Sequence, residues 1–372
     1  MQIDCAFPGG NILVDGIDGD VARIHQDLRD TEGDWFYWSF RVRGAHGRTV
    51  RFEFTGSNPI GVRGPAVSAD GGKSWQWLGT AAVTGQSFAY TFAHDAREVY
   101  FALGIPYLES HLHAFLAKHR ANSHLIVSEL CKTKRGRSVE LLRAGRIDGK
   151  PAHRVLLTAR HHSCEAVVNY TLDGLLDSVL STGALGDWFR EHVEILAVPF
   201  MDKDGVEDGD QGKNRKPYDH NRDYGTDLYA SVSALRKLVP DWSGGRLRAA
   251  LDLHCPWIRS GNNETIYFVG TSSAEHWNHV GAFSQILERE RTGPLPFQSA
   301  DNLAFGLGWN TYNGPLMMCQ NWAQSLPGVR LAATLEIPYA NASGAGVSAE
   351  SAHAFGRDLA VALQHYLKTI EV

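Results

Sequence analysis

The sequence predicts an α/β protein in which a largely parallel sheet flanked by helices is preceded by an antiparallel β-sandwich. Two observations lead to this prediction. In the first part of the chain, short aromatic and β-branched runs are broken by Gly, Asn and Asp, as is typical of antiparallel sheets. In the second part, apolar runs are separated by longer segments of helical periodicity, which favours a parallel sheet. The pattern changes near residue 105, so we expect domains over 1–105 and 106–372.

The predicted β-sandwich rests on runs that alternate locally between apolar and polar residues. These runs are "WFYWSFRVRG" (35–44), "RTVRFEFTG" (48–56), "KSWQWLG" (73–79), "SFAYTFAHD" (87–95) and "REVYFALGIPY" (97–107). Each is the length of a strand or hairpin segment, and alternation places one apolar face toward a core.

The second domain is predicted to open and close with helices, over 106–119 and 348–370, and to contain a third helix from Ala166 to Leu176. Between them lie buried runs of strand length. We expect these strands at 124–130, 138–145, 154–159, 193–200, 250–254, 265–270 and 330–336.

Composition excludes several classes of function. The chain has 372 residues, 43% hydrophobic and 21% charged, with a net charge of −5, as expected of a globular protein that binds neither nucleic acid nor acidic membranes. No run approaches the roughly 20 apolar residues of a membrane helix, and the first residues do not resemble a secretory signal. Five irregularly spaced cysteines indicate reduced thiols, so we expect a cytoplasmic protein.

A candidate metal site begins in the stretch "LLTARHHSCEAVVNYTLDGLL" (156–176), where His161, His162 and Glu165 fall between a strand and a helix. Taken alone, this pattern has a structural interpretation that is as good as a functional one: one histidine in the core, one on the surface, and a glutamate placed at a helix start by the helix dipole. A second predicted strand ends in His254, and His162, Glu165 and His254 together form a ligand set suited to Zn²⁺ with one open position.

Cys164 and Cys255 flank these residues and offer thiolates instead. Neighbours on a strand point to opposite faces, so His254 and Cys255 are not expected to bind one metal ion together.

Two further features carry polar groups toward the same end of the sheet. The strand in "VRLAATLEIPY" ends at Glu336, which is either a paired structural acid or a general base with a raised pKa. The loop 201–225 is about 25 residues long, and such loops within compact domains are more often functional than idle. It contains Arg215, Asn221 and Arg222, which can bind a carboxylate or an oxyanion.

The segments "HSCE", "YDHNRDYG", "LDLH" and "ATLE" resemble the zinc carboxypeptidases of the M14 class. "TARHHSCE", "SGNNETIYF", "FYWSFRVRG" and "EVYFALGIPYLESHL" are closest to the cytosolic carboxypeptidase branch, so the resemblance covers nearly the whole chain. It implies a mixed, largely parallel sheet preceded by an N-terminal β domain. It also implies one Zn²⁺ per chain and hydrolysis of the C-terminal peptide or glutamyl bond of a peptide by zinc-activated water.

The resemblance assigns a role to each matching residue. The implied metal ligands are His162, Glu165 and His254, and His161 is not among them. Glu336 is implied as the general acid and base, and Arg215 as the cation that polarises the scissile carbonyl. Asn221 and Arg222 are implied to bind the terminal carboxylate of the substrate. Asp219 is implied as the acid that orients a zinc-bound histidine, and Tyr312 as the tyrosine that covers the substrate.

Two departures concern Arg215. The usual Asn-Pro-Asp-Gly reads Asp202-Lys203-Asp204-Gly205, and Arg215 lies only six residues before Asn221.

Two other functions fit parts of this pattern. An aspartoacylase-type deacylase of N-acyl amino acids shares the zinc set and the Asn-Arg pair, but such enzymes tend to carry their extra domain at the C-terminus. A non-catalytic peptide- or glycan-binding protein would not need every catalytic residue type that is present. For the specificity pocket the sequence offers Gln320 and Asn321, and also Arg330, which fits equally the outward-facing start of a strand. Polyglutamate, ordinary peptides and cell-wall peptides therefore stay open as substrates.

Overall fold

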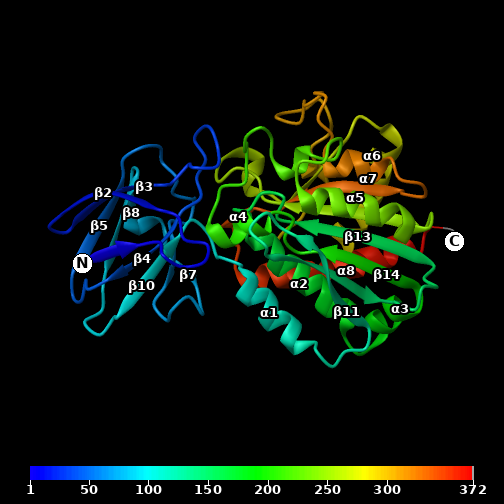
Figure 1. The fold of residues 1–372 in the computed structure, drawn as a ribbon, viewed down its shortest axis with the longest axis horizontal. Helices are drawn as coiled ribbons and strands as arrows, with labels where there is room; N and C mark the ends of the chain where they lie inside the picture. The colour runs from blue at the N-terminus through cyan, green and yellow to red at the C-terminus, as the bar shows by residue number, and fades with distance from the viewer. Residues whose placement is uncertain (371–372) are drawn as a thin grey trace.

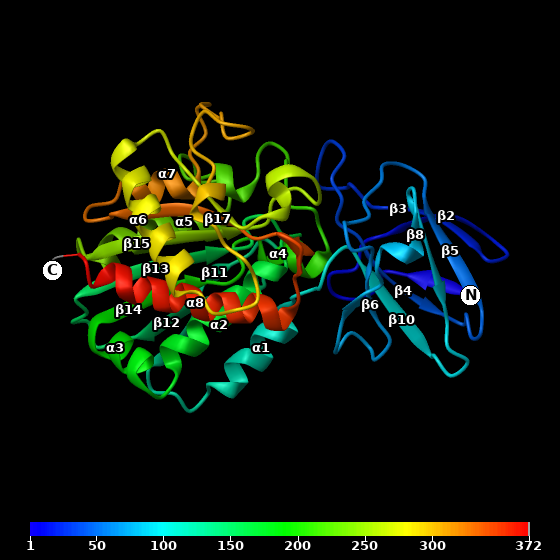
Figure 2. The same ribbon diagram turned by 180° about the vertical axis from the view of Figure 1, so that it is seen from behind.

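The first 105 residues form two five-stranded sheets packed face to face, as seen at one end of the molecule in Figure 1 and Figure 2. This computed structural model describes residues 1–370, so the last two residues of the expected range 106–372 lie outside it. One sheet has the order β1-β4-β10-β6-β7 and the other β2-β3-β5-β9-β8. The strands are β1 (Gln2–Asp4), β2 (Leu13–Asp18), β3 (Val21–His25), β4 (Ser39–Arg43), β5 (Thr49–Phe54), β6 (Ala66–Ser68), β7 (Gln76–Trp77), β8 (Val83–Thr84), β9 (Ser87–Thr91) and β10 (Glu98–Ala102).

Aromatic side chains hold these two sheets together. Phe40 and Phe101 of the first sheet face Phe52 of the second, with ring centroids 5.3 Å from Phe52 in both cases. These are alternate, inward-facing positions of their strands, which is why the runs of the sequence read as half-apolar. Neighbouring strands are antiparallel except β3 and β5, which pair in parallel.

The second part of the chain is built on a seven-stranded sheet of order β11-β12-β14-β13-β15-β17-β16. Its strands are β11 (Leu125–Lys132), β12 (Ser138–Gly145), β13 (His153–Ala159), β14 (Val193–Val198), β15 (Leu247–His254), β16 (Tyr267–Val269) and β17 (Leu331–Glu336). The four central strands, β14-β13-β15-β17, are parallel to one another, and the flanking pairs are antiparallel. The predicted α/β class with a mixed, largely parallel sheet is confirmed.

Helices cover both faces of this sheet because its strands are buried on both sides. They are α1 (Glu109–Lys118), α2 (Val167–Leu180), α3 (Ala184–His192), α4 (Lys203–Asp208), α5 (Ala230–Ser243), α6 (Ala274–Glu290), α7 (Cys319–Gln324) and α8 (Ala349–Leu367). The core on one face includes residues of α2, α6 and α8, and the core on the other includes residues of α5 and α7.

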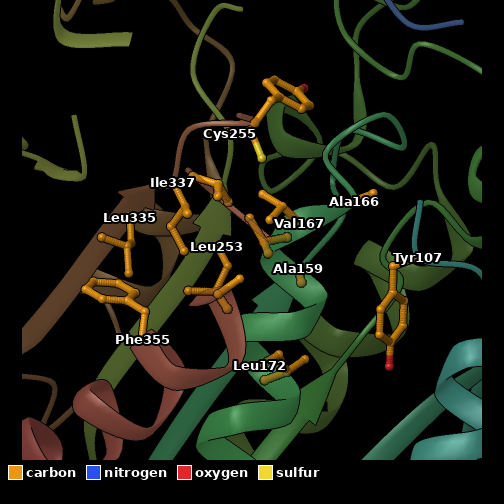
Figure 3. Close-up of a cluster of buried hydrophobic side chains, with 14 of the residues drawn as sticks. Tyr107, Ala159, Ala166, Val167, Leu172, Leu253, Cys255, Leu335, Ile337 and Phe355 are labelled. Carbon is orange, nitrogen blue, oxygen red and sulfur yellow. The ribbon is translucent and has the colours of Figure 1, made fainter. Parts of the chain in front are cut away.

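The parallel strands end together, which brings their last residues to one edge of the sheet. His254 at the end of β15 lies beside Glu336 at the end of β17 in the strand register. The residues before them, Leu253 and Leu335, point into the core near Phe355 of α8 (Figure 3). Since successive side chains alternate between faces, His254 and Glu336 are directed away from that core.

All five cysteines are free thiols. No helix within residues 1–370 is both long and apolar enough to cross a membrane.

Candidate active site

The turn that follows β13 carries the first two predicted metal ligands. Arg160 opens it with a positive φ of 61°, an uncommon backbone conformation for a residue with a side chain. Its buried guanidinium donates to the carbonyl oxygens of Ser163 and Tyr107 and to Asn169 Oδ1, at 2.9, 2.9 and 3.0 Å. Arg160 thus fixes a turn that regular secondary structure does not stabilise, and the strain is typical of functional sites.

His162, Glu165 and His254 converge into one cluster. His162 Nδ1 lies 3.0 Å from Glu165 Oε1, and His254 Nδ1 lies 2.9 Å from Glu165 Oε2. The two Nδ1 atoms are 3.2 Å apart. Their ligand atoms all lie within 4.8 Å of one another, a spacing that one metal ion could bridge.

The outer nitrogens of these rings test whether a cation fits. His254 Nε2 lies 2.7 Å from Asp252 Oδ2, and His162 Nε2 lies 3.5 Å from Asp219 Oδ2. A carboxylate beside Nε2 favours a proton on that nitrogen and leaves the Nδ1 lone pair for a metal. Two such lone pairs and a carboxylate facing one another are the donor set of a zinc site, and the residues therefore fit Zn²⁺.

The electrostatics of the cluster agree with a cation site. Burial alone would lower the pKa of His254, but Asp252 and Glu165 outweigh it and raise that pKa well above its ordinary value. Likewise, burial is outweighed at Glu165, where Lys213, His162 and His254 hold the pKa well below its ordinary value. The cluster is therefore built to hold positive charge next to Glu165.

His161 lies beside this cluster and uses both of its ring nitrogens elsewhere. Nδ1 is 2.8 Å from Asp252 Oδ1 and Nε2 is 2.8 Å from Tyr224 Oη. His161 therefore has no free lone pair directed at the cluster. It supports Asp252, which in turn contacts the outer nitrogen of His254.

Glu336 lies at the end of β17, next to His254. Its Oε2 is buried without a hydrogen-bond partner among the described residues. Burial raises the pKa of Glu336 above its ordinary value although His254 acts in the opposite direction. A buried carboxylate with a free oxygen beside a metal site is suited to accept a proton from water.

The loop between β14 and α5 forms another wall. Asp219 precedes the short 3₁₀ turn η2 (His220–Arg222), which carries Asn221 and Arg222. Asn221 accepts a hydrogen bond from the Cys319 backbone at 3.0 Å and lies 3.3 Å from His254 Nε2. The Arg222 guanidinium lies 5.2 Å from the centre of the Tyr312 ring, and no carboxylate within residues 1–370 pairs with it.

Arg215, from the same loop, is placed differently. Its Nη2 lies 2.7 Å from Asp202, 3.2 Å from Asp210 and 3.3 Å from Asp30. Three carboxylates thus lie beside one nitrogen of the guanidinium that the resemblance assigned to the scissile carbonyl, while Nε has no partner within residues 1–370. The cation beside the metal cluster is instead Lys213, whose Nζ lies 2.7 Å from Glu165 Oε1.

These groups share one cavity of about 990 Å³. Its walls include His162 and His254 of the metal cluster, the Asn221–Arg222 turn, Glu336, and several aromatic side chains. The aromatic residues are Trp35, Trp257, Phe305, Trp309 and Tyr312. Gln320, Asn321 and Thr334 line the cavity as neutral polar groups. Arg330 is not among the lining residues; it is exposed and lies 3.3 Å from Glu275.

Solved structures resemble this arrangement along the whole chain. A metallo-carboxypeptidase from Burkholderia cenocepacia has a TM-score of 0.81 at 22% identity, with 99% of each chain covered. A metallo-carboxypeptidase from Pseudomonas aeruginosa, in complex with (2-guanidinoethylmercapto)succinic acid, has a TM-score of 0.78 at 19% identity, again with 99% of each chain covered.

The chain has the metallo-carboxypeptidase fold. The resemblance expected from the sequence motifs is confirmed at that level. No protein-family model matches the chain.

Sequence relatives of this metallo-carboxypeptidase-like chain include an uncharacterised protein of Zymomonas mobilis, 26% identical over 213 residues. Mouse cytosolic carboxypeptidase 2 is 25% identical over 228 residues. The matches cover 55% and 56% of this chain, and 54% and 26% of those proteins. The chain thus matches about half the length of the first and about a quarter of the second.

Within this metallo-carboxypeptidase fold, sequence reasoning missed Asp252, Lys213 and Arg160. Asp252 had a signal, because a residue two positions before His254 on one strand shares its face. No sequence signal singles out Lys213, because it lies in a charged loop among several other lysines and arginines.

Proposed function

We propose that this protein is a zinc-dependent metallocarboxypeptidase that removes the C-terminal residue of a peptide. One observation carries the proposal: an Arg222 guanidinium without a carboxylate partner within residues 1–370 lines the same cavity as His162 and His254 of the candidate metal cluster. A cation left unpaired beside a hydrolytic centre is suited to an anionic substrate group. The sequence relatives named cytosolic carboxypeptidase support the same assignment.

The terminal carboxylate of the substrate would bind at Arg222. Guanidinium offers a planar pair of donors to a carboxylate, and Asn221 adds an amide from the same turn. The Tyr312 ring beside Arg222 can cover the bound end of the chain. The succinic acid derivative bound by the Pseudomonas protein is also a carboxylate ligand, which supports an anion site in this fold.

His162, Glu165 and His254 would hold the metal ion, with Asp219 and Asp252 fixing the two imidazole rings. Bound Zn²⁺ would supply Lewis acidity and lower the pKa of a water molecule.

Glu336 would move the proton. It takes a proton from the water whose oxygen attacks the carbonyl carbon, and it later gives that proton to the amine as the C–N bond breaks. The free Oε2 and the raised pKa of Glu336 support both halves of this role.

The test compares one N-acylated dipeptide as free acid and as C-terminal amide. We expect kcat/KM to fall by orders of magnitude for the amide, because Arg222 then lacks its charged partner. Arg222→Lys should be nearly as harmful as Arg222→Ala, while the exposed Arg330→Lys serves as the matched control and leaves rates unchanged. Equal rates on acid and amide would refute the carboxylate site, and faster cleavage of N-acyl amino acids would favour the deacylase.

A second test concerns Glu336. The variant Glu336→Gln keeps the shape of the side chain but cannot accept the proton, so zinc content should be retained while kcat falls by at least about 100-fold. Metal analysis and initial rates on the same preparation check both points. Substantial hydrolysis by this variant would place the base elsewhere.

A further inference from the structure

Aromatic rings from both parts of the chain border the cavity beside the candidate metal centre. Trp257 lies three residues after His254, where the chain leaves β15, and it is 38% exposed. Trp35 and Phe36, from the N-terminal part (residues 1–105), pack against it with ring centroids 5.3 and 4.8 Å from that of Trp257. Both tryptophans line the cavity, so the N-terminal part supplies some of its wall.

Neighbouring groups hold the two tryptophan rings in place. Trp35 Nε1 donates to the Glu32 carbonyl oxygen at 2.9 Å. Phe36 meets the Trp257 ring edge to face at 88° and packs in turn against Tyr339, with ring centroids 5.6 Å apart. Rings that are fixed in this way lose little conformational entropy when a ligand binds, which favours affinity.

The tryptophans adjoin the metal cluster on the side of Glu165. Lys213 Nζ lies 2.7 Å from Glu165 Oε1 and 5.6 Å from the centre of the Trp35 ring. The same ammonium donates to the carbonyl oxygen of Cys255, two residues before Trp257, at 2.9 Å. One side chain therefore connects a candidate metal ligand with both tryptophans.

The proposed carboxylate site adjoins the cluster through other residues. Asn221 lies 3.3 Å from His254 Nε2, and the Arg222 guanidinium lies 5.2 Å from the centre of the Tyr312 ring. When the terminal carboxylate of a peptide is at Arg222 and its scissile carbonyl is at the metal cluster, the residue before the scissile bond needs a place of its own. The tryptophans offer that place, because they line the same cavity on the Glu165 side.

The surface at this end of the cavity is apolar. The planes of Trp35 and Trp257 are inclined at 56°, so the rings do not stack and neither covers the other. The cation that lies over Trp35 is Lys213, whose charge is balanced by Glu165. Exposed aromatic surface inside a cavity is suited to an apolar group of a ligand. An acidic group would find no unpaired cation over these two rings within residues 1–370.

We infer that Trp35 and Trp257 bind the side chain that precedes the scissile bond and that they select large apolar residues at that position. This inference rests on the proposed function and names the class of its substrate, namely peptides with an aromatic or aliphatic penultimate residue. It gives the N-terminal part a role in specificity, because Trp35 and its neighbour Phe36 come from there.

The experiment uses the full-length, zinc-loaded chain and a set of N-acylated dipeptides. All end in leucine and differ only in the penultimate residue, which is phenylalanine, leucine, alanine or glutamate. Initial rates give kcat/KM for each dipeptide. Calorimetry measures the affinity for two phosphonate analogues that cannot be cleaved, one with a benzyl and one with a methyl side chain in the penultimate position. Zinc content is measured on each variant.

The wild type should cleave the phenylalanine and leucine dipeptides with kcat/KM at least about tenfold above the alanine and glutamate dipeptides, as an apolar site commonly discriminates. Trp257→Ala should bring the ratio of phenylalanine to alanine close to one, and Trp35→Ala should lower it as well. Trp257→Phe should keep most of the preference, because an aromatic ring remains. This ratio does not depend on the fraction of folded enzyme, so a general loss of stability leaves it unchanged.

The matched control is Trp309→Ala. Trp309 is 55% exposed and lines the same cavity, but it belongs to the loop that carries Tyr312. The ratio of phenylalanine to alanine should therefore stay at its wild-type value in this variant. A larger loss of preference in Trp309→Ala than in Trp257→Ala would overturn the inference. An unchanged ratio in Trp35→Ala would also overturn it, and this variant carries the test if Trp257→Ala fails to fold.

The phosphonates separate failure of this inference from failure of the proposed function. A zinc-loaded wild type that hydrolyses none of the dipeptides would refute the proposed function. The benzyl analogue should still bind at least about tenfold more tightly than the methyl analogue, and Trp257→Ala should remove that difference. Equal affinities of the wild type for the two analogues would refute the aromatic binding site, whatever the rates.

Discussion

At the scale of single residues, the candidate metal centre depends on where each histidine directs its two nitrogens. His162 and His254 turn Nδ1 toward Glu165 and Nε2 toward Asp219 and Asp252. His161, the immediate neighbour of His162, has both nitrogens engaged by Asp252 and Tyr224. The hydrogen bonds of their ring nitrogens thus distinguish the proposed metal ligand His162 from its neighbour His161.

The first prediction follows from this difference. His162→Ala and His254→Ala should each abolish stoichiometric zinc binding, because only two protein ligands would remain. His161→Ala should still bind one zinc ion but with an affinity about 10- to 100-fold lower, as is typical when a residue behind a metal ligand is lost. Competition with a chelator of known affinity measures both effects. Full zinc in His254→Ala would contradict the assignment.

A second prediction concerns His220, which is buried, stacks on Tyr229 with ring centroids 3.6 Å apart, and has no hydrogen-bond partner for Nδ1 within residues 1–370. Burial lowers the pKa of His220 to about 4. Between that value and the ordinary 6.5, the unfolded chain binds more protons than the folded one, so stability is complete above pH 6.5 and is lost as pH falls. The difference between the two pKa values corresponds to about 3 kcal/mol of unfolding free energy.

The variant His220→Phe isolates this effect, since it keeps the stacking and removes the titration. Urea unfolding of metal-free wild type and variant should be compared at pH 7 and pH 4. The difference in unfolding free energy should move in favour of the variant by about 3 kcal/mol at the lower pH. If the difference in unfolding free energy between wild type and variant is the same at pH 7 and pH 4, His220 takes up a proton as readily in the folded protein as in the unfolded chain.

The site was partly predictable at this scale. Residues at strand ends, such as His254 and Glu336, have a place fixed by periodicity, and the structure brings them together. Arg215 and Lys213 stand two positions apart in an irregular loop, where no periodicity tells which cation faces the cavity. Their partners, Asp30 and Glu165, are distant in sequence, so only tertiary structure separates the two.

At the scale of elements, the helices α2 and α8 approach closely enough to exclude side chains. A Cβ on Gly174 of α2 would lie 1.9 Å from the His353 carbonyl oxygen, and one on Gly356 of α8 would lie 2.0 Å from that of Thr171. The two glycines therefore let the helices pack backbone against backbone beneath the strands that end in the site.

The third prediction is that Gly174→Ala destabilises the fold by at least the roughly 1–3 kcal/mol of an overpacked core. The matched control is Gly281→Ala in α6, where a Cβ would meet nothing within 4 Å. That change should be neutral or stabilising by up to about 1 kcal/mol, because alanine is the better helix former. Thermal unfolding measures both, and equal melting temperatures would contradict the close packing.

The elements themselves were largely predictable in the second half of the chain. The strand expected at 138–145, for example, has the limits Ser138–Gly145 in the structure. The first half was harder. The segment 73–79 contains only the two-residue strand Gln76–Trp77, while Leu13–Asp18 was not anticipated. Leu13–Asp18 reads LVDGID, in which apolar and polar residues do not alternate, and its residues are mostly exposed at a sheet edge, so the pattern of a half-buried strand is absent.

At the scale of the whole molecule, the side chains that line the cavity bear on which C-terminal residue the proposed enzyme would accept. The lysine and arginine residues of its walls are Lys213, Arg215 and Arg222. The first two have acidic partners, and Arg222 is the proposed binder of the main-chain carboxylate. Beyond them the walls offer neutral groups, among them Asn321, whose buried Oδ1 has no partner within residues 1–370.

The fourth prediction is a preference for neutral C-terminal side chains. Peptides ending in leucine or glutamine should be cleaved at least about tenfold faster, by kcat/KM, than matched peptides ending in glutamate or lysine, because a buried charge without a partner is costly. A panel that varies only the last residue measures this. Preferential cleavage of C-terminal glutamate would show that a cation reaches the pocket from elsewhere.

The junction between the two parts of the chain has a consequence for how such a protein can change over time. Asp30 and Trp35 on one side, and Gln211, Lys213 and Arg215 on the other, form a single set of mutual contacts. A chimaera that exchanges the first 105 residues for those of a distant homologue would inherit half of this set and mismatch the other half. The two parts are therefore expected to evolve together, and shuffling them as independent modules should displace the loop that carries Gln211, Lys213 and Arg215 unless both halves of the contact are exchanged together.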